Sequence, residues 1–151
     1  MRIALDTGVL IAMAGQHSDV GVISDAERLR SLVARSDAHE LHLPTPVIAE
    51  FMFHPSGSAD FARQFGVLPL NERAALLAGE AARGNFRAGE HGRHCLKMDY
   101  VNWAICRAWN VDYLCTLDRD PMRINQFAGS DMKVGDIRAL IAELEGSSAD
   151  R

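Results

Sequence analysis

Short apolar runs alternate along this chain with longer stretches in which apolar residues recur at helical spacing. Strands that alternate with helices favour parallel pairing, because each helix returns the chain to the same edge of the sheet. The pattern therefore predicts an α/β layer fold around a mostly parallel sheet. The runs that we interpret as strands are 2–5, 40–43, 67–70, 113–117 and 132–134.

Amphipathic stretches between these runs predict the helices. We expect them at 7–14, 20–36, 45–53, 59–65, 71–83, 98–109 and 136–144. Several end residues support the boundaries: Asn71 and Asp136 are suited to begin helices, whereas Gly15 and Asn110 are suited to end them. The segment Gly84–His94 has no clear period, so we predict a surface loop or a frayed helix pair there.

The length of 151 residues suits one domain with one hydrophobic core, which we place at 1–145, followed by a loose tail at 146–151. No apolar run approaches the roughly 18 residues that a membrane span needs. Asp6 interrupts the apolar run that a signal peptide would require, so we expect a cytoplasmic protein without membrane contact. The three cysteines form no CxxC pair, which favours reduced thiols.

The net charge of −4 argues against a broad basic surface for nucleic acid. This argument concerns only the net charge of the whole chain. Carboxylates that converge on one site and hold divalent cations no longer make that site anionic. Basic residues near such a site would then matter more than the sum.

Four carboxylates fall where a parallel sheet would gather them. Asp6 and Asp118 each follow a predicted strand, and ligands of open parallel sheets bind beyond the carboxyl ends of the strands. Glu50 and Asp99 lie near the start of predicted helices, which can face the same edge. We expect these four side chains to form one cluster.

A cluster of this kind suits the hydrolysis of phosphodiester bonds. That reaction needs a nucleophilic water at neutral pH and neutralisation of charge on the phosphate, and one or two Mg²⁺ or Mn²⁺ ions provide both. Hard cations prefer oxygen ligands, and Mg²⁺ usually combines few carboxylates with several waters. Without a cation the carboxylates would repel one another, and some would hold a proton.

Each acid also has an ordinary structural interpretation. Asp6 and Asp99 could cap helices, and Glu50 could be a solvated helix residue. Asp118 and Asp120 could be turn residues ahead of Pro121. From the residues alone, the metal site and these structural roles both remain open.

Four segments of the chain resemble the motifs of PIN-domain ribonucleases, particularly the toxins of VapBC-type toxin–antitoxin pairs. In order, the segments are 3–10 (IALDTGVL), 43–51 (LPTPVIAEF), 97–104 (KMDYVNWA) and 114–120 (LCTLDRD). Each motif is short, but their order and spacing are similar to those of the family over nearly the whole chain. The third segment departs from the family, which usually has small residues where this chain has Tyr100, Asn102 and Trp103.

The resemblance implies an α/β/α sandwich around a parallel five-stranded sheet, Mg²⁺ or Mn²⁺ as cofactor, and endonucleolytic cleavage of RNA. It also implies a homodimer and a small antitoxin protein as partner. On this basis Asp6, Asp99 and Asp118 would bind the cation or its waters, and Glu50 would bind through water or orient the attacking hydroxide.

Other residues would support this site. The hydroxyl groups of Thr7 and Thr116 would hold a carboxylate or a water in place, and Asp120 would either join Asp118 or turn the chain. The basic candidates for phosphate contacts, for which a solvated surface charge is the ordinary alternative, are Lys97, Arg93, Arg119 and Arg123.

Other functions are less well supported by the sequence. His91, His94 and Cys95 lack the fourth ligand of a structural zinc site. The main alternative to a nuclease is a catalytically inactive PIN-like module that binds RNA or protein. A phosphatase on the same class of fold is a third hypothesis, although such enzymes usually carry a second Asp where this chain has Gly8.

Overall fold

A computed structural model describes residues 1–87 and 97–149. The described residues form a five-stranded sheet in the order β3-β2-β1-β4-β5. All four pairings are parallel, as predicted, and the central strand β1 aligns Ala4 with His42 on one side and with Leu114 on the other. The strands are β1 (Arg2–Leu5), β2 (Glu40–Pro44), β3 (Gly66–Leu68), β4 (Tyr113–Cys115) and β5 (Lys133–Gly135).

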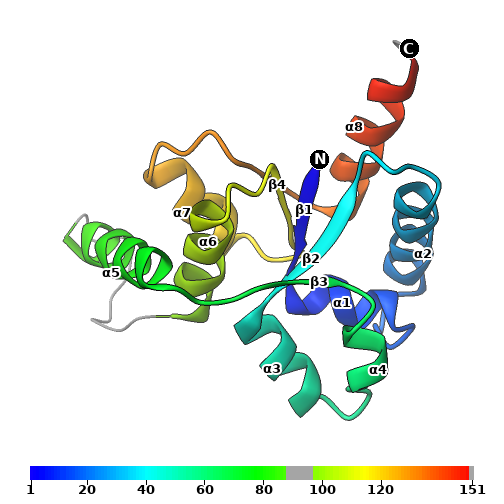
Figure 1. Cartoon of the computed structure of the whole chain (residues 1–151), viewed down its shortest axis with the longest axis horizontal. Coiled ribbons are helices and arrows are strands. Elements are labelled where there is room, and N and C mark those ends of the chain that lie inside the picture. The colour runs from blue at the N-terminus through cyan, green and yellow to red at the C-terminus, as the bar shows by residue number, and fades with distance from the viewer. Residues whose placement is uncertain (88–96, 150–151) are drawn as a thin grey trace.

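Helices cover both faces of this sheet, which gives the predicted α/β/α sandwich (Figure 1). On one side lie α1 (Thr7–Met13), α2 (Val20–Ala34), α3 (Thr45–Phe53), α4 (Ala59–Ala62) and α8 (Ile137–Ala149). On the other side lie α5 (Glu72–Arg87), α6 (Met98–Ala108) and α7 (Asp120–Phe127).

Successive residues of β1 face opposite sides of the sheet and divide the core into two layers. Ile3 and Leu5 pack among the side chains of α1, α2 and α8, whereas Ala4 packs among those of α5 and α6. All three side chains are fully buried. A strand buried on both faces explains why β1 reads as a continuous apolar run rather than an alternating one.

Polar residues fix several helix ends at the predicted positions. The carboxylate of Asp136 accepts a hydrogen bond from the amide N–H of Ala139 at 2.8 Å, and the side-chain oxygen of Asn71 accepts one from Ala74 at 2.8 Å. Gly15 follows α1 with a φ of 74°, a left-handed conformation that glycine adopts without strain. These contacts confirm the helix boundaries expected at Gly15, Asn71 and Asp136.

Three helices differ most from the sequence-based expectation, and α4 ends at Ala62 rather than at residue 65. Asp120–Phe127 forms α7, where only a turn was considered, and proline is accommodated there because it stands in the first turn. Helix α5 continues to Arg87, past the start of the expected loop at Gly84. Helix α8 continues to Ala149, so the tail expected from residue 146 is helical up to that residue. The remainder of the expected loop, 88–94, lies outside the described residues.

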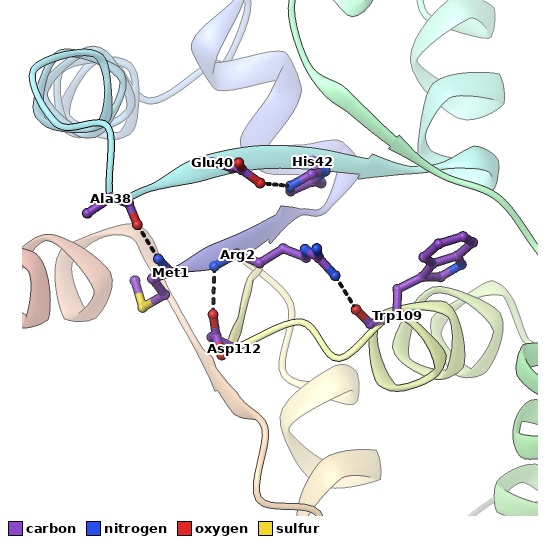
Figure 2. Close-up of polar contacts among 7 residues, drawn as sticks. All are labelled: Met1, Arg2, Ala38, Glu40, His42, Trp109 and Asp112. Carbon is purple, nitrogen blue, oxygen red and sulfur yellow. Dashed lines mark hydrogen bonds and ion pairs between the residues drawn. The ribbon is translucent and has the colours of Figure 1, made fainter.

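The amino-terminal edge of the sheet is bound together by paired polar groups (Figure 2). The main-chain N–H of Arg2 donates to the carboxylate of Asp112 at 2.6 Å, and its guanidinium donates to the carbonyl of Trp109 at 2.6 Å. The nitrogen of Met1 donates to the carbonyl of Ala38. These hydrogen bonds join β1 to the segments that lead into β2 and β4.

The helices in residues 1–87 and 97–149 include none that is long and apolar enough to cross a membrane.

Candidate metal and phosphate site

Asp6 lies directly beyond the carboxyl end of the central strand and is the most enclosed of the predicted carboxylates. Its side chain is 8% exposed and accepts two hydrogen bonds, from the amide N–H of Thr7 at 2.8 Å and from the hydroxyl of Thr116 at 2.7 Å. Burial raises the pKa of this carboxyl, the two hydrogen bonds oppose that rise, and the charges of Asp118 and Glu50 add to it. Asp6 therefore caps α1 and also belongs to a group of acids.

Thr116 joins two of the predicted acids. It follows β4, is fully buried, and its main-chain N–H donates to the carbonyl of Gly135 at 3.0 Å. Its hydroxyl donates to Asp6 and accepts the amide N–H of Asp118 at 3.0 Å. One side chain thereby fixes the orientation of the Asp6 carboxylate and the turn that carries Asp118.

Glu50 reaches the group from α3. Its exposed carboxylate accepts a hydrogen bond from the hydroxyl of Thr7, at the start of α1. Pro44 ends β2 and directly precedes α3, so the short connection keeps Glu50 at the same edge of the sheet as Asp6. The structure thus places both predicted threonines against carboxylates of the group.

Asp99 joins from the other helical layer. It lies in the first turn of α6, whose N-cap is Lys97, so Asp99 does not itself cap the helix. Partial burial raises the pKa of its carboxyl, and the charges of Asp6, Asp120 and Asp118 raise it further, while Lys97 opposes the rise. These mutual effects bring all of the predicted acids into one electrostatic group.

Asp120 and the basic residues form the outer part of the group. Asp120 lies in the first turn of α7, where it pairs with the ammonium of Lys97 at 3.6 Å and with the guanidinium of Arg123 at 3.8 Å. Asp118 and Arg119 are exposed, and Arg119 has no ion-pair partner in the part of the chain that is described. Arg93, the fourth basic candidate, lies outside the described residues.

The donor set fits a hard divalent cation in chemistry but not as a closed cage. All of the candidate ligands are carboxylate oxygens. Burial first, and neighbouring carboxylates second, raise the pKa of Asp6 and of Asp99, and a cation would offset the effect of the neighbouring charges. Among residues 1–87 and 97–149, however, no three His, Cys, Asp or Glu side chains are arranged to ligate one ion directly. An ion held here would therefore have to keep several of its waters, as Mg²⁺ usually does.

One polar residue near this group was not assigned a role from the sequence. Asn102, on α6, is 4% exposed, and its side-chain oxygen is enclosed without a hydrogen-bond partner. The sequence signal was its position three residues after Asp99, in place of a small residue.

Solved structures share this arrangement of elements. VapBC2 from Rickettsia felis, solved with a DNA fragment from its promoter, superposes with a TM-score of 0.63 at 16% identity, covering 90% of this chain and 98% of that chain. The chain has a PIN-like fold. VapBC-1 from nontypeable Haemophilus influenzae gives a TM-score of 0.62 at 20% identity, covering 91% and 99% of the two chains.

A third solved neighbour is FitAcB from Neisseria gonorrhoeae, with a TM-score of 0.59 at 16% identity over 89% of this chain and 97% of that chain. At these identities the likeness establishes the fold. Neither the known family models nor the curated proteins give a sequence match.

Proposed function

We propose that this PIN-like chain is a metal-dependent endoribonuclease that hydrolyses RNA phosphodiester bonds with Mg²⁺ or Mn²⁺. The observation that carries the proposal is the buried contact between Asp6 and Thr116, around which Glu50, Asp99 and Asp118 are electrostatically coupled. Carboxylates held at the carboxyl edge of a parallel sheet without balancing cations are costly for the fold, and a divalent cation removes that cost.

The residues divide into those that would hold the cation and those that would position them. Asp6, Asp99 and Asp118 would hold it directly or through waters, and Thr116 keeps the Asp6 carboxylate in its orientation. When bound, the cation would supply a water of lowered pKa and neutralise charge on the phosphate. Glu50, held by Thr7, is exposed and would accept a proton from the attacking water.

The basic residues would contact the RNA backbone. Arg119 is exposed at the start of α7 beside Asp118, which makes it the best available contact for a phosphate. Lys97 and Arg123 are engaged by Asp120, so their contribution would require that these ion pairs open. Few contacts of this kind imply that binding of RNA depends more on the cation than on surface charge.

The proposal includes partners. Two of the solved neighbours are VapBC proteins and one is FitAcB, and by analogy we propose that this chain is the toxin of a toxin–antitoxin pair. A homodimer and a small antitoxin protein are the expected assembly. Copurification of a tagged chain with a protein encoded beside it would test this part separately from the chemistry.

Cleavage of mixed cellular RNA tests the activity. Wild-type protein with MgCl₂ or MnCl₂ is compared with the same protein in EDTA and with Asp6→Asn. The control Asp131→Asn removes one carboxylate from an exposed ion pair with Arg107, outside the acid group. Metal-dependent cutting by wild type and by the control, but not by Asp6→Asn, is expected; full activity of Asp6→Asn would contradict the proposal.

A binding module without catalysis is the second candidate function. The absence of a three-residue ligand group among the described side chains favours it. Calorimetric titration with Mn²⁺ separates the two functions, because a binding module need not hold the ion whereas the nuclease must.

A further inference from the structure

Asn102 carries an unpaired side-chain oxygen in an otherwise apolar part of α6. Its neighbours Val101, Trp103 and Ala104 are buried apolar residues, and its own side chain is 4% exposed. The amide oxygen is enclosed and accepts no hydrogen bond from the described part of the protein. A buried acceptor without a partner is unfavourable, and in native proteins such atoms usually bind a water or an ion.

Other side-chain amides of the same helical layer have partners. Asn85 on α5 is 2% exposed and donates to the hydroxyl of Tyr100 at 2.9 Å. Asn125 on α7 accepts from the indole N–H of Trp103 at 2.9 Å and donates to the carbonyl of Met132 at 2.7 Å. The unpaired oxygen of Asn102 is therefore specific to its position and not a general property of amides in this layer.

The position of Asn102 on α6 places it beside the acid group. Residues three and four apart share one face of a helix, so Asp99, Asn102 and Cys106 form one stripe. The charge of Asp6 is among the causes that raise the pKa of Asp99 and also the pKa of the Cys106 thiol. The charge of Asp6 thus acts on both ends of the stripe, and Asn102 lies between them on the helix.

We propose that Asn102 is a positioning residue of the candidate site, whose amide oxygen accepts a hydrogen bond from a water that also contacts the bound divalent cation. This inference rests on the proposed function. A cation-bound water has two hydrogens to donate, and the amide oxygen and a carboxylate oxygen of the acid group would accept one each. An amide accepts without adding a further negative charge to the group, which a carboxylate at the same position would do.

Mn²⁺ affinity and thermal stability together test the inference. Calorimetry compares wild type with Asn102→Leu, which keeps a similar volume but removes the acceptor. Residues that orient a metal site through a contact of this kind typically change metal affinity by about 10- to 100-fold when replaced. We expect a loss of this size, with a Tm in EDTA that is unchanged or higher because an unpaired buried polar atom has been removed.

Asn125→Leu is the matched control, because it makes the same substitution at a paired amide on the neighbouring helix. It should lower Tm and leave Mn²⁺ affinity unchanged. Asn102→Ala and Asn102→Ser serve if leucine prevents folding: alanine removes the acceptor and should weaken Mn²⁺ binding, whereas serine retains a hydroxyl oxygen and should weaken it less.

Two results would overturn the inference, and they have different consequences for the proposed function. If wild type binds Mn²⁺ and the folded Asn102 variants bind it equally well, Asn102 has no part in the site while the proposed function stands. If wild type binds no Mn²⁺, the inference and the metal-dependent function fail together.

Discussion

The buried hydroxyl of Thr116 connects two carboxylate residues of the candidate site. This hydroxyl is fully buried and uses both its donor and its acceptor capacity, toward Asp6 and toward the N–H of Asp118. We predict that Thr116→Val, which keeps the shape, lowers the free energy of unfolding by about 1–3 kcal/mol, because buried polar partners lose their hydrogen bonds. Urea unfolding measures the change.

A serine at this position tests the contribution of the hydroxyl group separately from that of the methyl group. Thr116→Ser retains both hydrogen bonds and should keep most of the stability and of the metal-dependent activity. Equal stability of the valine variant and wild type would show that these two hydrogen bonds do not stabilise the fold.

Asp99 provides a pH test, because burial and neighbouring acids raise the pKa of its carboxyl in the folded state. Between its unfolded value of 3.8 and the higher folded value, the folded protein binds more protons than the unfolded chain. This contribution to stability is complete below the unfolded pKa and is lost as pH rises through the folded pKa. We predict that Asp99→Asn raises Tm at pH 7 in EDTA, and that the gain disappears toward pH 3.

Asp131 serves as the control, because the pKa of its carboxyl is shifted in the opposite direction from that of Asp99. The hydrogen bond from Arg107 lowers the pKa of its carboxyl, so this ion pair contributes stability above the unfolded pKa and loses it in acid. Asp131→Asn should therefore not raise Tm at pH 7. If Asp99→Asn also failed to raise it, the charge repulsion inferred at the acid group would be wrong.

The positions of the acids could be predicted from the sequence to different degrees. Asp6 and Asp118 follow strands, and the rule for open parallel sheets suffices to place them at one edge. The contact between Thr7 and Glu50 could not be predicted, because it depends on how α3 packs beside α1. The burial of Asn102 likewise depends on packing around α6, which a single sequence does not specify.

Among the elements, all five strands and most helices were predictable, whereas helix α7 and the carboxyl-terminal ends of α5 and α8 were not. Helix α7 escaped prediction because Asp120 and Pro121 are typical of turns as well as of a first helical turn. Helices α5 and α8 run through Gly84 and Gly146, which on local preference alone indicate helix ends. At Gly84, which lies against the ring of Phe127, tertiary packing offsets the roughly 1 kcal/mol that glycine costs inside a helix.

The side chain of Asn125 connects helix α7 to its neighbours and can be tested by substitution. Asn125 joins the indole of Trp103 on α6 to the carbonyl of Met132 ahead of β5. We predict that Asn125→Ala lowers the free energy of unfolding by about 1–3 kcal/mol and increases amide exchange in α7. Gln126→Ala, at an exposed position of the same helix, is the control and should change neither quantity.

Over the whole molecule, the two edges of the sheet are electrostatically unlike. At the amino-terminal edge, the main-chain N–H of Arg2 donates to the carboxylate of Asp112 and the guanidinium of Arg2 donates to the carbonyl of Trp109 (Figure 2). Nearby, Arg107 and Lys133 pair with Asp131 and Glu143. At the carboxyl edge, acids accumulate around Asp6 and lie at the ends of elements from both helical layers. A fold stabilised by two apolar cores can tolerate this repulsion at one edge, and the edge is then available for a cation.

This asymmetry predicts that Mn²⁺ reverses a stability ranking. In EDTA at pH 7, Asp99→Asn should have a higher Tm than wild type, because it removes a partly buried charge and relieves repulsion within the acid group. A ligand present at about 100 times its Kd stabilises the folded state by about 2.7 kcal/mol, which for a chain of this size raises Tm by roughly 5–10 °C. Wild type should gain this shift in Mn²⁺ and Asp99→Asn should gain much less, so their melting curves should exchange order. Parallel shifts in both proteins, measured by calorimetry at one protein concentration, would mean that Mn²⁺ binds elsewhere.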